Sequence, residues 1–248
     1  MAAVLSGARA AVALLTIVPV GHPSADAGAM RGAAAWFPLV GGLVGAAAAG
    51  ALALVHEPLG PAYAAGLALL VSAVAAGALH HDGLADTADG LGPRTGVDAR
   101  LAAMRDSGIG AYGSLALIGF VVLSVAALGR LETTDAIAAL IAGHTLGRWA
   151  ALPQLTWVAP ARPDGLGRSF TAGPFELAAG SVVAVAVAVA LCGVEAGLAA
   201  CLGAALASGA VAALSRSAFG GRTGDTLGAS VLVAEAVVYS VLSGYWVV

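Results

Sequence analysis

Long apolar segments alternate with shorter polar ones along the whole of this 248-residue chain. Each apolar segment is about 20 residues long, the length that an α-helix needs to cross the hydrocarbon core of a bilayer. We predict membrane-spanning helices over residues 36–55, 62–80, 110–129, 136–152, 177–192, 195–213 and 228–247. Because the segments follow one another closely, the pattern predicts an all-α integral membrane protein. It would be a polytopic bundle of about seven transmembrane helices in a single domain, residues 1–248.

The first apolar segment, residues 3–19, differs from the others. It is short, it ends at Pro19, and it carries Arg9 near its middle. A helix of this kind lies more easily in the membrane interface than across the bilayer. We therefore expect an interfacial or re-entrant N-terminal helix. The first full span would be entered through Trp36 and Phe37, since aromatic side chains favour the interface.

Composition excludes an ordinary soluble domain. Hydrophobic residues make up 60% of the chain and charged residues 10%, with a mean hydropathy of +0.94, whereas soluble domains carry about 25% charged residues. The net charge of -3 says little about partners; we expect a lipid bilayer and no nucleic acid, and leave a homo-oligomer open. Cys192 and Cys201 lie in an Ala- and Val-rich stretch without a CxxC spacing, so we expect buried free thiols.

The arginines divide the connecting loops into two sets. The loops of the first set are 20–35, 81–109, 153–175 and 214–227, and they contain Arg31, Arg94, Arg100, Arg105, Arg162, Arg168, Arg216 and Arg222. The loops of the second set are 56–61, 130–135 and 193–195, and they contain Arg130 alone. By the positive-inside rule the first set is cytoplasmic. We expect these four loops to form the active face of the protein.

An acidic stretch follows the second predicted span, in the segment from His80 to Gly90. If it is helical, Asp82, Asp86 and Asp89 are spaced i, i+4 and i+7 and share one face. Three like charges on one face repel each other unless a cation lies among them, and Mg²⁺ prefers carboxylate oxygens together with water and substrate phosphates. The alternative is a solvated helix start, where aspartates interact favourably with the helix dipole.

Three glycine-rich segments place arginine beside hydroxyl or carboxylate groups. The segments are Met104 to Gly113, with Arg105, Asp106 and Ser107; Gly165 to Phe170, with Arg168; and Gly220 to Gly228, with Arg222, Thr223 and Asp225. Arginine, hydroxyls and close backbone N–H groups suit a phosphate. Helix caps and ordinary turns are the alternative reading of each segment. None of them is a Walker A sequence, because the chain has no lysine.

Two further residues suggest chemistry near the membrane. Arg148 falls inside a predicted span, where a phosphate would be a natural partner and snorkelling is the alternative. His80 precedes the acidic helix and could act as a base or a hydrogen-bond donor. His144, on an apolar helix, is expected to be a satisfied interior histidine. The sequence offers no Ser-His-Asp order and no zinc-ligand spacing.

The acidic stretch, His80-x-Asp82-Gly-Leu-Ala-Asp86-Thr-x-Asp89-Gly, resembles the hallmark of the cobalamin synthase family, the adenosylcobinamide-GDP ribazoletransferases. The resemblance continues through Phe37-Pro38-Leu39-Val40-Gly41, Met104-Arg105-Asp106-Ser107-x-x-Gly110-x-x-Gly113, Gly165-Leu166-Gly167 and Gly221-x-Thr223-Gly224-Asp225-Thr226-Leu227-Gly228-Ala229. These segments occur in the family's order from near residue 15 to residue 235. The chain departs from the family where a Thr-Arg-x-Pro pattern reads Thr16-Ile17-Val18-Pro19, and where Ser-Arg reads Gly147-Arg148.

This resemblance implies a Mg²⁺-dependent enzyme of the inner membrane that acts late in coenzyme B12 assembly. It would join adenosylcobinamide-GDP to alpha-ribazole, or to alpha-ribazole 5'-phosphate, and release GMP. The implied catalytic residues are Asp82, His80 and Arg105, with the choice between Asp82 and His80 as base left open. The implied substrate-binding residues are Ser107, Arg148, Arg168, Arg222 and Thr223. The implied metal ligands are Asp82, Asp86, Asp89, Asp106 and Asp225.

Two other functions compete with this interpretation. A CDP-alcohol-type phosphotransferase also places carboxylates on a helix at the membrane face, but its signature runs Asp-x-x-Asp-Gly-x-x-Ala-Arg. Here Ala85 is followed by Asp86, and the first two aspartates are four residues apart. A cation transporter would place acids and broken helices near the middle of the membrane, whereas here the acids cluster in a predicted loop.

Overall fold

A computed structural model describes residues 2–21, 32–93, 96–162 and 171–247, and within them every regular element is a helix. The elements are α1 (Ala2–Leu15), η1 (Ala34–Trp36), α3 (Phe37–Leu59), α4 (Pro61–Ala75), α5 (Leu79–Asp89), α6 (Val97–Ala103), α7 (Ala111–Leu128), α8 (Thr133–Trp157), α10 (Pro174–Cys192), α11 (Val194–Phe219) and α12 (Gly224–Trp246). One isolated β-bridge joins Pro160 and Arg222. The predicted all-α class is confirmed.

Five helical segments in the described part of the chain are long and apolar enough to cross a membrane. They are η1 with α3, then α7, α10, α11 and α12. Helices α4 and α5 qualify only as a pair, and they are bent by 94° relative to each other, which would make either a broken sixth span or a re-entrant loop. All seven predicted segments are helical, but the second one is interrupted and the fourth, in α8, is less apolar than a typical span. The protein is thus an integral, polytopic helical membrane protein.

The break between α4 and α5 lies at Gly77 and Ala78, which have φ values of +59° and +56°. Ala78 is the one described non-glycine residue with positive φ, a left-handed conformation that is uncommon for a residue with a Cβ atom. The backbone N–H of Ile17, just beyond α1, donates a 2.9 Å hydrogen bond to the carbonyl of Ala75. The acidic helix α5 therefore starts from a fixed turn.

Several predicted loops are shorter in the structure than the sequence pattern indicated. Segment 81–109 contains most of α5 and all of α6, and segment 214–227 is helical except for the short turn 220–223 between α11 and α12. Helix α8 continues through Pro153, and α3 continues through Pro58. The change from apolar to polar residues therefore did not predict where the helices end, because several helices continue into the polar segments.

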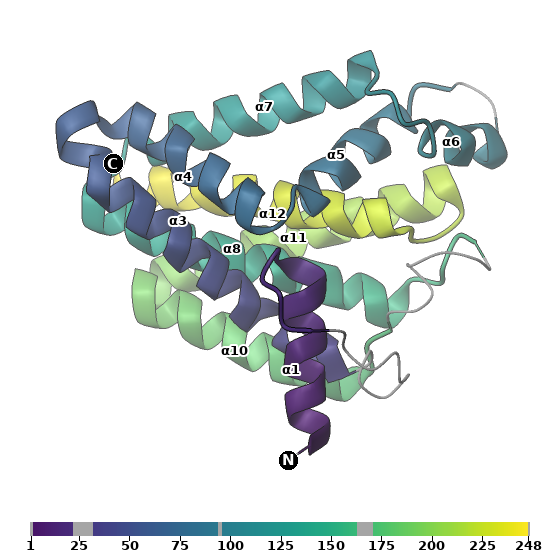
Figure 1. The fold of residues 1–248 in the computed structure, drawn as a ribbon, viewed down its shortest axis with the longest axis horizontal. Helices are drawn as coiled ribbons and strands as arrows, with labels where there is room; N and C mark the ends of the chain where they lie inside the picture. The colour runs from purple at the N-terminus through teal and green to yellow at the C-terminus, as the bar shows by residue number, and fades with distance from the viewer. Residues whose placement is uncertain (1, 22–31, 94–95, 163–170, 248) are drawn as a thin grey trace.

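Helix α8 lies in the centre of the bundle and packs against α3, α10, α11 and α12 (Figure 1). Small residues allow this close approach. A Cβ atom at Gly41 of α3 would lie 2.2 Å from the carbonyl oxygen of His144, and one at Gly45 would lie 2.8 Å from the Cα atom of Ile141. Close contact through glycine is how transmembrane helices gain packing energy in lipid.

The outer surface of the bundle is apolar. Large exposed side chains include Leu43 on α3, Leu115 and Leu123 on α7, Val182 on α10 and Leu206 on α11. Contiguous exposed apolar surface of this kind is not stable in water and is suited to contact with lipid tails. Cys192 and Cys201 are free, as predicted; Cys192 is buried and Cys201 is partly buried.

Helix α1 runs in a different direction from the long helices of the bundle (Figure 1). It packs on α3 and η1, and its residues Ala10, Ala11 and Leu15 are buried in a second apolar cluster. At 14 residues it is too short for a typical span. The interfacial or re-entrant placement of this helix stays a prediction.

Candidate functional site

A cavity of about 420 Å³ lies at the end of the bundle where α1, α3, α5, α8 and α12 meet. We call it the arginine cavity because its polar lining includes four arginines. The polar and charged residues that line it are His80, Asp82, Arg105, Arg148, Arg162, Arg222, Thr223 and Asp225. These residues come from α5, from α8, from the start of α12 and from three connecting segments, so the fold and not the local sequence brings them together.

A second cavity of about 450 Å³ shares Asp82, Met104 and Arg105 with the first. We call it the aspartate cavity. Its further polar residues are His81, Asp86, Asp106 and Ser107. Among the described residues, Asp82 is the one carboxylate that lines both cavities. The two cavities therefore meet at a carboxylate and a guanidinium, which are groups able to act on a phosphate and its counter-ion.

The carboxylates of α5 and α12 lie close enough to affect one another. The pKa of Asp86 is raised to about 6, first by partial burial and then by the negative charges of Asp82, Asp225 and Asp89. We treat α5 as lying outside the spans, because it is bent away from α4 and its eleven residues carry three aspartates. Like charges gathered in this way favour binding of a proton or a cation.

The described residues contain no group of three His, Cys, Asp or Glu side chains arranged to hold a metal ion on their own. Oxygen donors are nevertheless present, because Asp82, Asp86 and Asp106 line one cavity and Asp225 lines the neighbouring one. This donor set fits Mg²⁺, which is usually bound through one or two carboxylates with water and substrate phosphates as the other ligands. It does not fit a closed site built from protein ligands alone.

Asp89 has a partner that the sequence did not predict. Its Oδ2 accepts a 2.7 Å hydrogen bond from the N–H of Gly110, and its Oδ1 accepts a 2.9 Å bond from the N–H of Gly113. These N–H groups lie at the start of α7, where a carboxylate is favourable. A Cβ atom at either glycine would lie 2.4 Å from an Asp89 oxygen. The prediction that these two N–H groups approach a phosphate is wrong, because both of them donate to Asp89. The role of Asp89 as a metal ligand stays a prediction.

Helices α5 and α12 are in direct contact through glycine. A Cβ atom at Gly83 would lie 2.8 Å from the carbonyl oxygen of Asp225 and 3.1 Å from the Cα atom of Gly228. The glycine that follows Asp82 in the acidic motif thus allows α5 to lie against the first turn of α12. This contact places Asp82 and Asp225 on the same cavity.

The turn that carries Arg222 is held by the segment after α8. The N–H of Arg222 donates to the carbonyl of Ala159 at 2.9 Å, and the N–H of Ala161 donates to the carbonyl of Arg222 at 2.8 Å. A Cβ atom at Gly221 would lie 2.4 Å from the Ala159 oxygen, so the motif needs glycine there for close backbone contact. Thr223 caps α12 by accepting a 3.1 Å bond from the N–H of Thr226.

Arg222 and two other arginines also donate from their side chains to backbone carbonyls. Arg222 donates to Val158, Arg162 donates to Leu101, and Arg216 donates to Trp157 at 2.9 Å. These bonds join the described parts of segments 81–109, 153–175 and 214–227. The arginines of the predicted active face therefore hold its loops together as well as lining a cavity.

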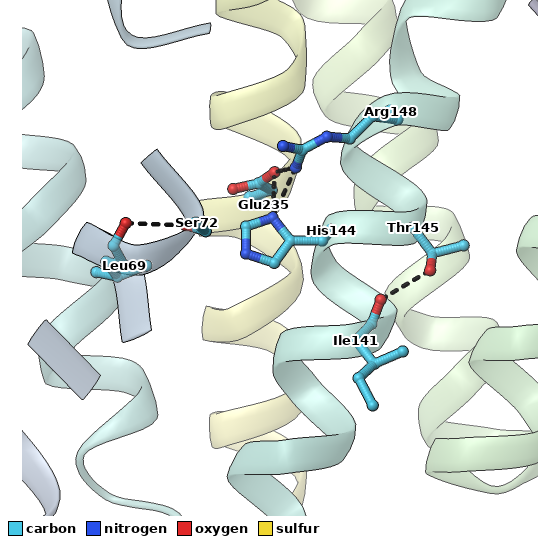
Figure 2. Close-up of polar contacts among 7 residues, drawn as sticks. All are labelled: Leu69, Ser72, Ile141, His144, Thr145, Arg148 and Glu235. Atoms are coloured by element: carbon cyan, nitrogen blue, oxygen red, sulfur yellow. Dashed lines mark hydrogen bonds and ion pairs between the residues drawn. The ribbon is translucent and has the colours of Figure 1, made fainter. Parts of the chain in front are cut away.

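A buried charged cluster joins α8 and α12 (Figure 2), and one of its members, Arg148, lines the arginine cavity. His144 and Arg148, one turn apart on α8, both point toward Glu235 of α12. His144 Nδ1 lies 2.8 Å from Glu235 Oε1, and Arg148 Nη1 donates to the same oxygen. The three side chains are at most 2% exposed. Glu235 therefore balances the charge of Arg148 and fixes its position, and His144 has the interior partner that the sequence suggested.

Glu235 and Arg162 were missed as site residues by sequence reasoning. Glu235 falls in the middle of an apolar span, and an ionisable residue there is a functional candidate by default, so that signal was available. Its partner was not, because 87 residues separate Arg148 from Glu235. The structure also explains why glycine precedes Arg148: a Cβ atom at Gly147 would lie 2.7 Å from Glu235 Cγ.

The structure brings most of the predicted site residues together around the two cavities. His80, Asp82, Arg105, Arg148, Arg222, Thr223 and Asp225 line the arginine cavity, while Asp86, Asp106 and Ser107 line the aspartate cavity. Asp106 also accepts a 3.1 Å hydrogen bond from the N–H of Gly108 within its own turn. Asp89 lines neither cavity. Arg168 lies outside the described residues, so its predicted role stays a prediction.

A polytopic helical membrane protein with arginines and carboxylates facing shared cavities has the site of a membrane enzyme for phosphate-bearing substrates. Comparison with known proteins makes this specific. The chain belongs to the cobalamin-5-phosphate synthase family, whose family model matches residues 7–243. No solved structure matches the chain.

Curated relatives extend along almost the whole chain. A protein of Bradyrhizobium diazoefficiens is 41% identical over 98% of this chain and 95% of its own length. One from Klebsiella pneumoniae subsp. pneumoniae is 42% identical over 80% of this chain and 82% of its own. One from Desulforamulus reducens is 34% identical over 96% and 97%. All three are named adenosylcobinamide-GDP ribazoletransferase, so the family that the sequence motifs resemble is confirmed.

Proposed function

We propose that the chain joins adenosylcobinamide-GDP to alpha-ribazole, or to its 5'-phosphate, and releases GMP. The observation that carries this proposal is the meeting of the two cavities at Asp82 and Arg105, with three more arginines lining the first cavity. A diphosphate placed there would lie among guanidinium and carboxylate groups. Family membership supplies the identity of the substrates, through the names of the relatives.

The reaction is a displacement at phosphorus. A ribazole hydroxyl, expected to be the 3'-hydroxyl, attacks the phosphate that is attached to cobinamide. The bond from that phosphorus to the bridging oxygen breaks, and GMP leaves with the oxygen. The hydroxyl proton passes to a base, for which Asp82 and His80 are both placed because each lines the arginine cavity.

The arginines bind and orient the phosphates. Arg105 lies where the cavities meet, and Arg148 and Arg222 lie deeper, with exposed fractions of 2% and 4%. Guanidinium groups in a site shielded from water stabilise negative charge on non-bridging oxygens more strongly than they would in water. Thr223 and Ser107 add hydroxyl groups to the two cavities, one to each.

Mg²⁺ is the expected cofactor. Asp82 and Asp86 would hold it, with Asp89, Asp106 and Asp225 as the further predicted ligands. When bound, the ion would neutralise the diphosphate and stabilise the charge on the leaving group. The crowded carboxylates of α5 and α12 support this assignment, since like charges gathered together favour a bound cation.

The expected location is the inner membrane, with the active face on the cytoplasmic side. The arginine-bearing segments 81–109, 153–175 and 214–227 support this orientation through the positive-inside rule. The bilayer is the expected partner of the apolar outer surface, no nucleic acid is expected, and a homo-oligomer stays open.

The rival functions receive less support. A CDP-alcohol-type phosphotransferase does not fit the family match or the spacing of the aspartates. A cation transporter would place its carboxylates on a broken helix within the membrane. Asp82 and Asp86 lie on α5, beyond the 94° bend after α4, so it is the family match that disfavours this function.

The proposed function is tested by product analysis. The purified chain in lipid vesicles, given adenosylcobinamide-GDP, alpha-ribazole and Mg²⁺, is expected to form GMP and a cobalamin product in equal amounts. Chromatography of nucleotides and corrinoids measures both. Release of GDP in place of GMP would contradict the proposed site of attack, and an ion flux without any nucleotide product would favour the transporter.

A further inference from the structure

The arginine cavity has an apolar wall that the proposed phosphate chemistry does not use. Leu14 and Leu15 of α1, Phe37 of α3, Leu155 of α8 and Leu227 of α12 line it. All five belong to, or pack against, the single apolar cluster beneath α1. These five residues therefore form one apolar part of the lining, and Leu79, Met104 and Val231 are further apolar residues elsewhere in it.

This wall offers no side-chain hydrogen bonds. Its five residues are leucine and phenylalanine, so any polar group of a ligand placed against them would lose its water without gaining a partner. The cost of burying an unpaired polar atom is large enough to select between ligands of similar size. The wall therefore suits a flat apolar ring and disfavours a base rich in donors and acceptors.

We infer that this apolar wall, closed by α1, is the subsite for the aromatic base of the acceptor nucleoside. The inference rests on the proposed function and deepens it by assigning one part of one substrate to one side of the cavity. The base of alpha-ribazole is a benzimidazole, an almost wholly apolar bicyclic ring. Guanine, the base on the other substrate, presents several hydrogen-bonding groups and does not match this wall.

The size and position of the cavity support this assignment. A volume of about 420 Å³ is in the range that encloses most of a small organic ligand, and it suits a nucleoside but not a corrinoid ring. A base seated against Leu155 and Leu15 would leave its ribose facing His80 and Asp82, which line the same cavity. The hydroxyl that attacks would then lie beside the two candidate bases.

The assignment also gives α1 a function. Its last turn supplies Leu14 and Leu15, and the segment that follows is tied to the end of α4 by the hydrogen bond from Ile17 to Ala75. The N-terminal helix, which at 14 residues is shorter than a typical span, becomes a wall of the acceptor subsite.

A pair of matched variants tests the subsite. Leu14 and Leu177 are both partly buried and both pack against the same apolar cluster, but only Leu14 lines the cavity. We compare wild type, Leu14→Gln and Leu177→Gln in nanodiscs, using the α-ribonucleosides of 5,6-dimethylbenzimidazole and of adenine. Two readouts are taken: equilibrium binding of each nucleoside without the second substrate, and the ratio of kcat/KM for the two acceptors.

In wild type, binding and kcat/KM are expected to favour the benzimidazole nucleoside by at least about tenfold. The reason is that adenine would leave at least one polar atom buried without a hydrogen-bond partner. Leu14→Gln should reduce this preference several-fold, and Leu177→Gln should leave it unchanged. A wild-type preference near one overturns the inference, as does an equal change in both variants. Displacement of the bound nucleoside by lipid alone would make the wall a lipid site and would also overturn it. If no acceptor yields GMP, the proposed function fails; if GMP forms without base preference, only the subsite fails.

Discussion

Replacement of Asp82 by asparagine is expected to lower the rate of GMP release by at least about 100-fold, the usual effect of removing one group that stabilises transition-state charge. Asp82 is the carboxylate at which the two cavities meet, and it is both a predicted metal ligand and a candidate base. Asparagine keeps the shape of the side chain and removes its charge, so the helix contact at Gly83 should persist. Initial rates in vesicles at saturating Mg²⁺ measure the effect.

The matched control is Asp98→Asn. Asp98 is an exposed aspartate in the first turn of α6 and lines neither cavity, so its variant should keep wild-type turnover and expression. Near-normal GMP release by Asp82→Asn, with intact membrane insertion, would remove Asp82 from both proposed roles. Equal losses in the two variants would point to a general effect of charge on this face.

Replacement of Glu235 by leucine is expected to have the largest effect on stability. It would leave Arg148 and His144 buried without their carboxylate, and breaking a buried ion pair by removing one partner costs about 3–5 kcal/mol. Thermal unfolding in nanodiscs should show a clearly lowered midpoint. Turnover should fall as well, because Arg148 lines the cavity from the position that Glu235 fixes.

Two comparisons separate the charge effect from simple damage to the core. The double variant Glu235→Leu with Arg148→Met removes both charges and should regain most of the lost stability, but not the turnover. Tyr239→Phe removes a hydroxyl that is buried without a hydrogen-bond partner in the same region, and should change stability little. A double variant that is no more stable than Glu235→Leu would show that the ion pair is not the cause.

The helices were predictable because the bilayer imposes one length and one polarity on each span. The break at Gly77 and Ala78 was not, since nothing in the local sequence requires a left-handed alanine, and the turn depends on α1 binding to the end of α4. The central position of α8 was not predictable either, because it depends on contacts with four other helices. The sequence pattern predicted α8 only as a span that contains Arg148, and the structure shows that Arg148 is buried in the bundle.

The chemistry of the site was predictable from residue types, whereas the pairing within it was not. Asp82, Arg105 and Arg222 stand out because charges are scarce in this chain. In contrast, two contacts join residues that are far apart in the sequence. Asp89 accepts hydrogen bonds from the N–H groups of Gly110 and Gly113, and Arg148 pairs with Glu235. The glycines of the predicted phosphate segments were also misread in part, because Gly110 and Gly221 allow close contacts within the protein.

The central claim is that the carboxylates of α5 act with Mg²⁺ on a diphosphate held by the arginines. Its most direct test is GMP release from adenosylcobinamide-GDP and alpha-ribazole while Mg²⁺ is titrated against a chelator, in wild type and in Asp86→Asn. We predict no release with the chelator, saturable recovery with Mg²⁺ in wild type, and a higher Mg²⁺ requirement in Asp86→Asn. Release at the full rate in the presence of the chelator would contradict the claim.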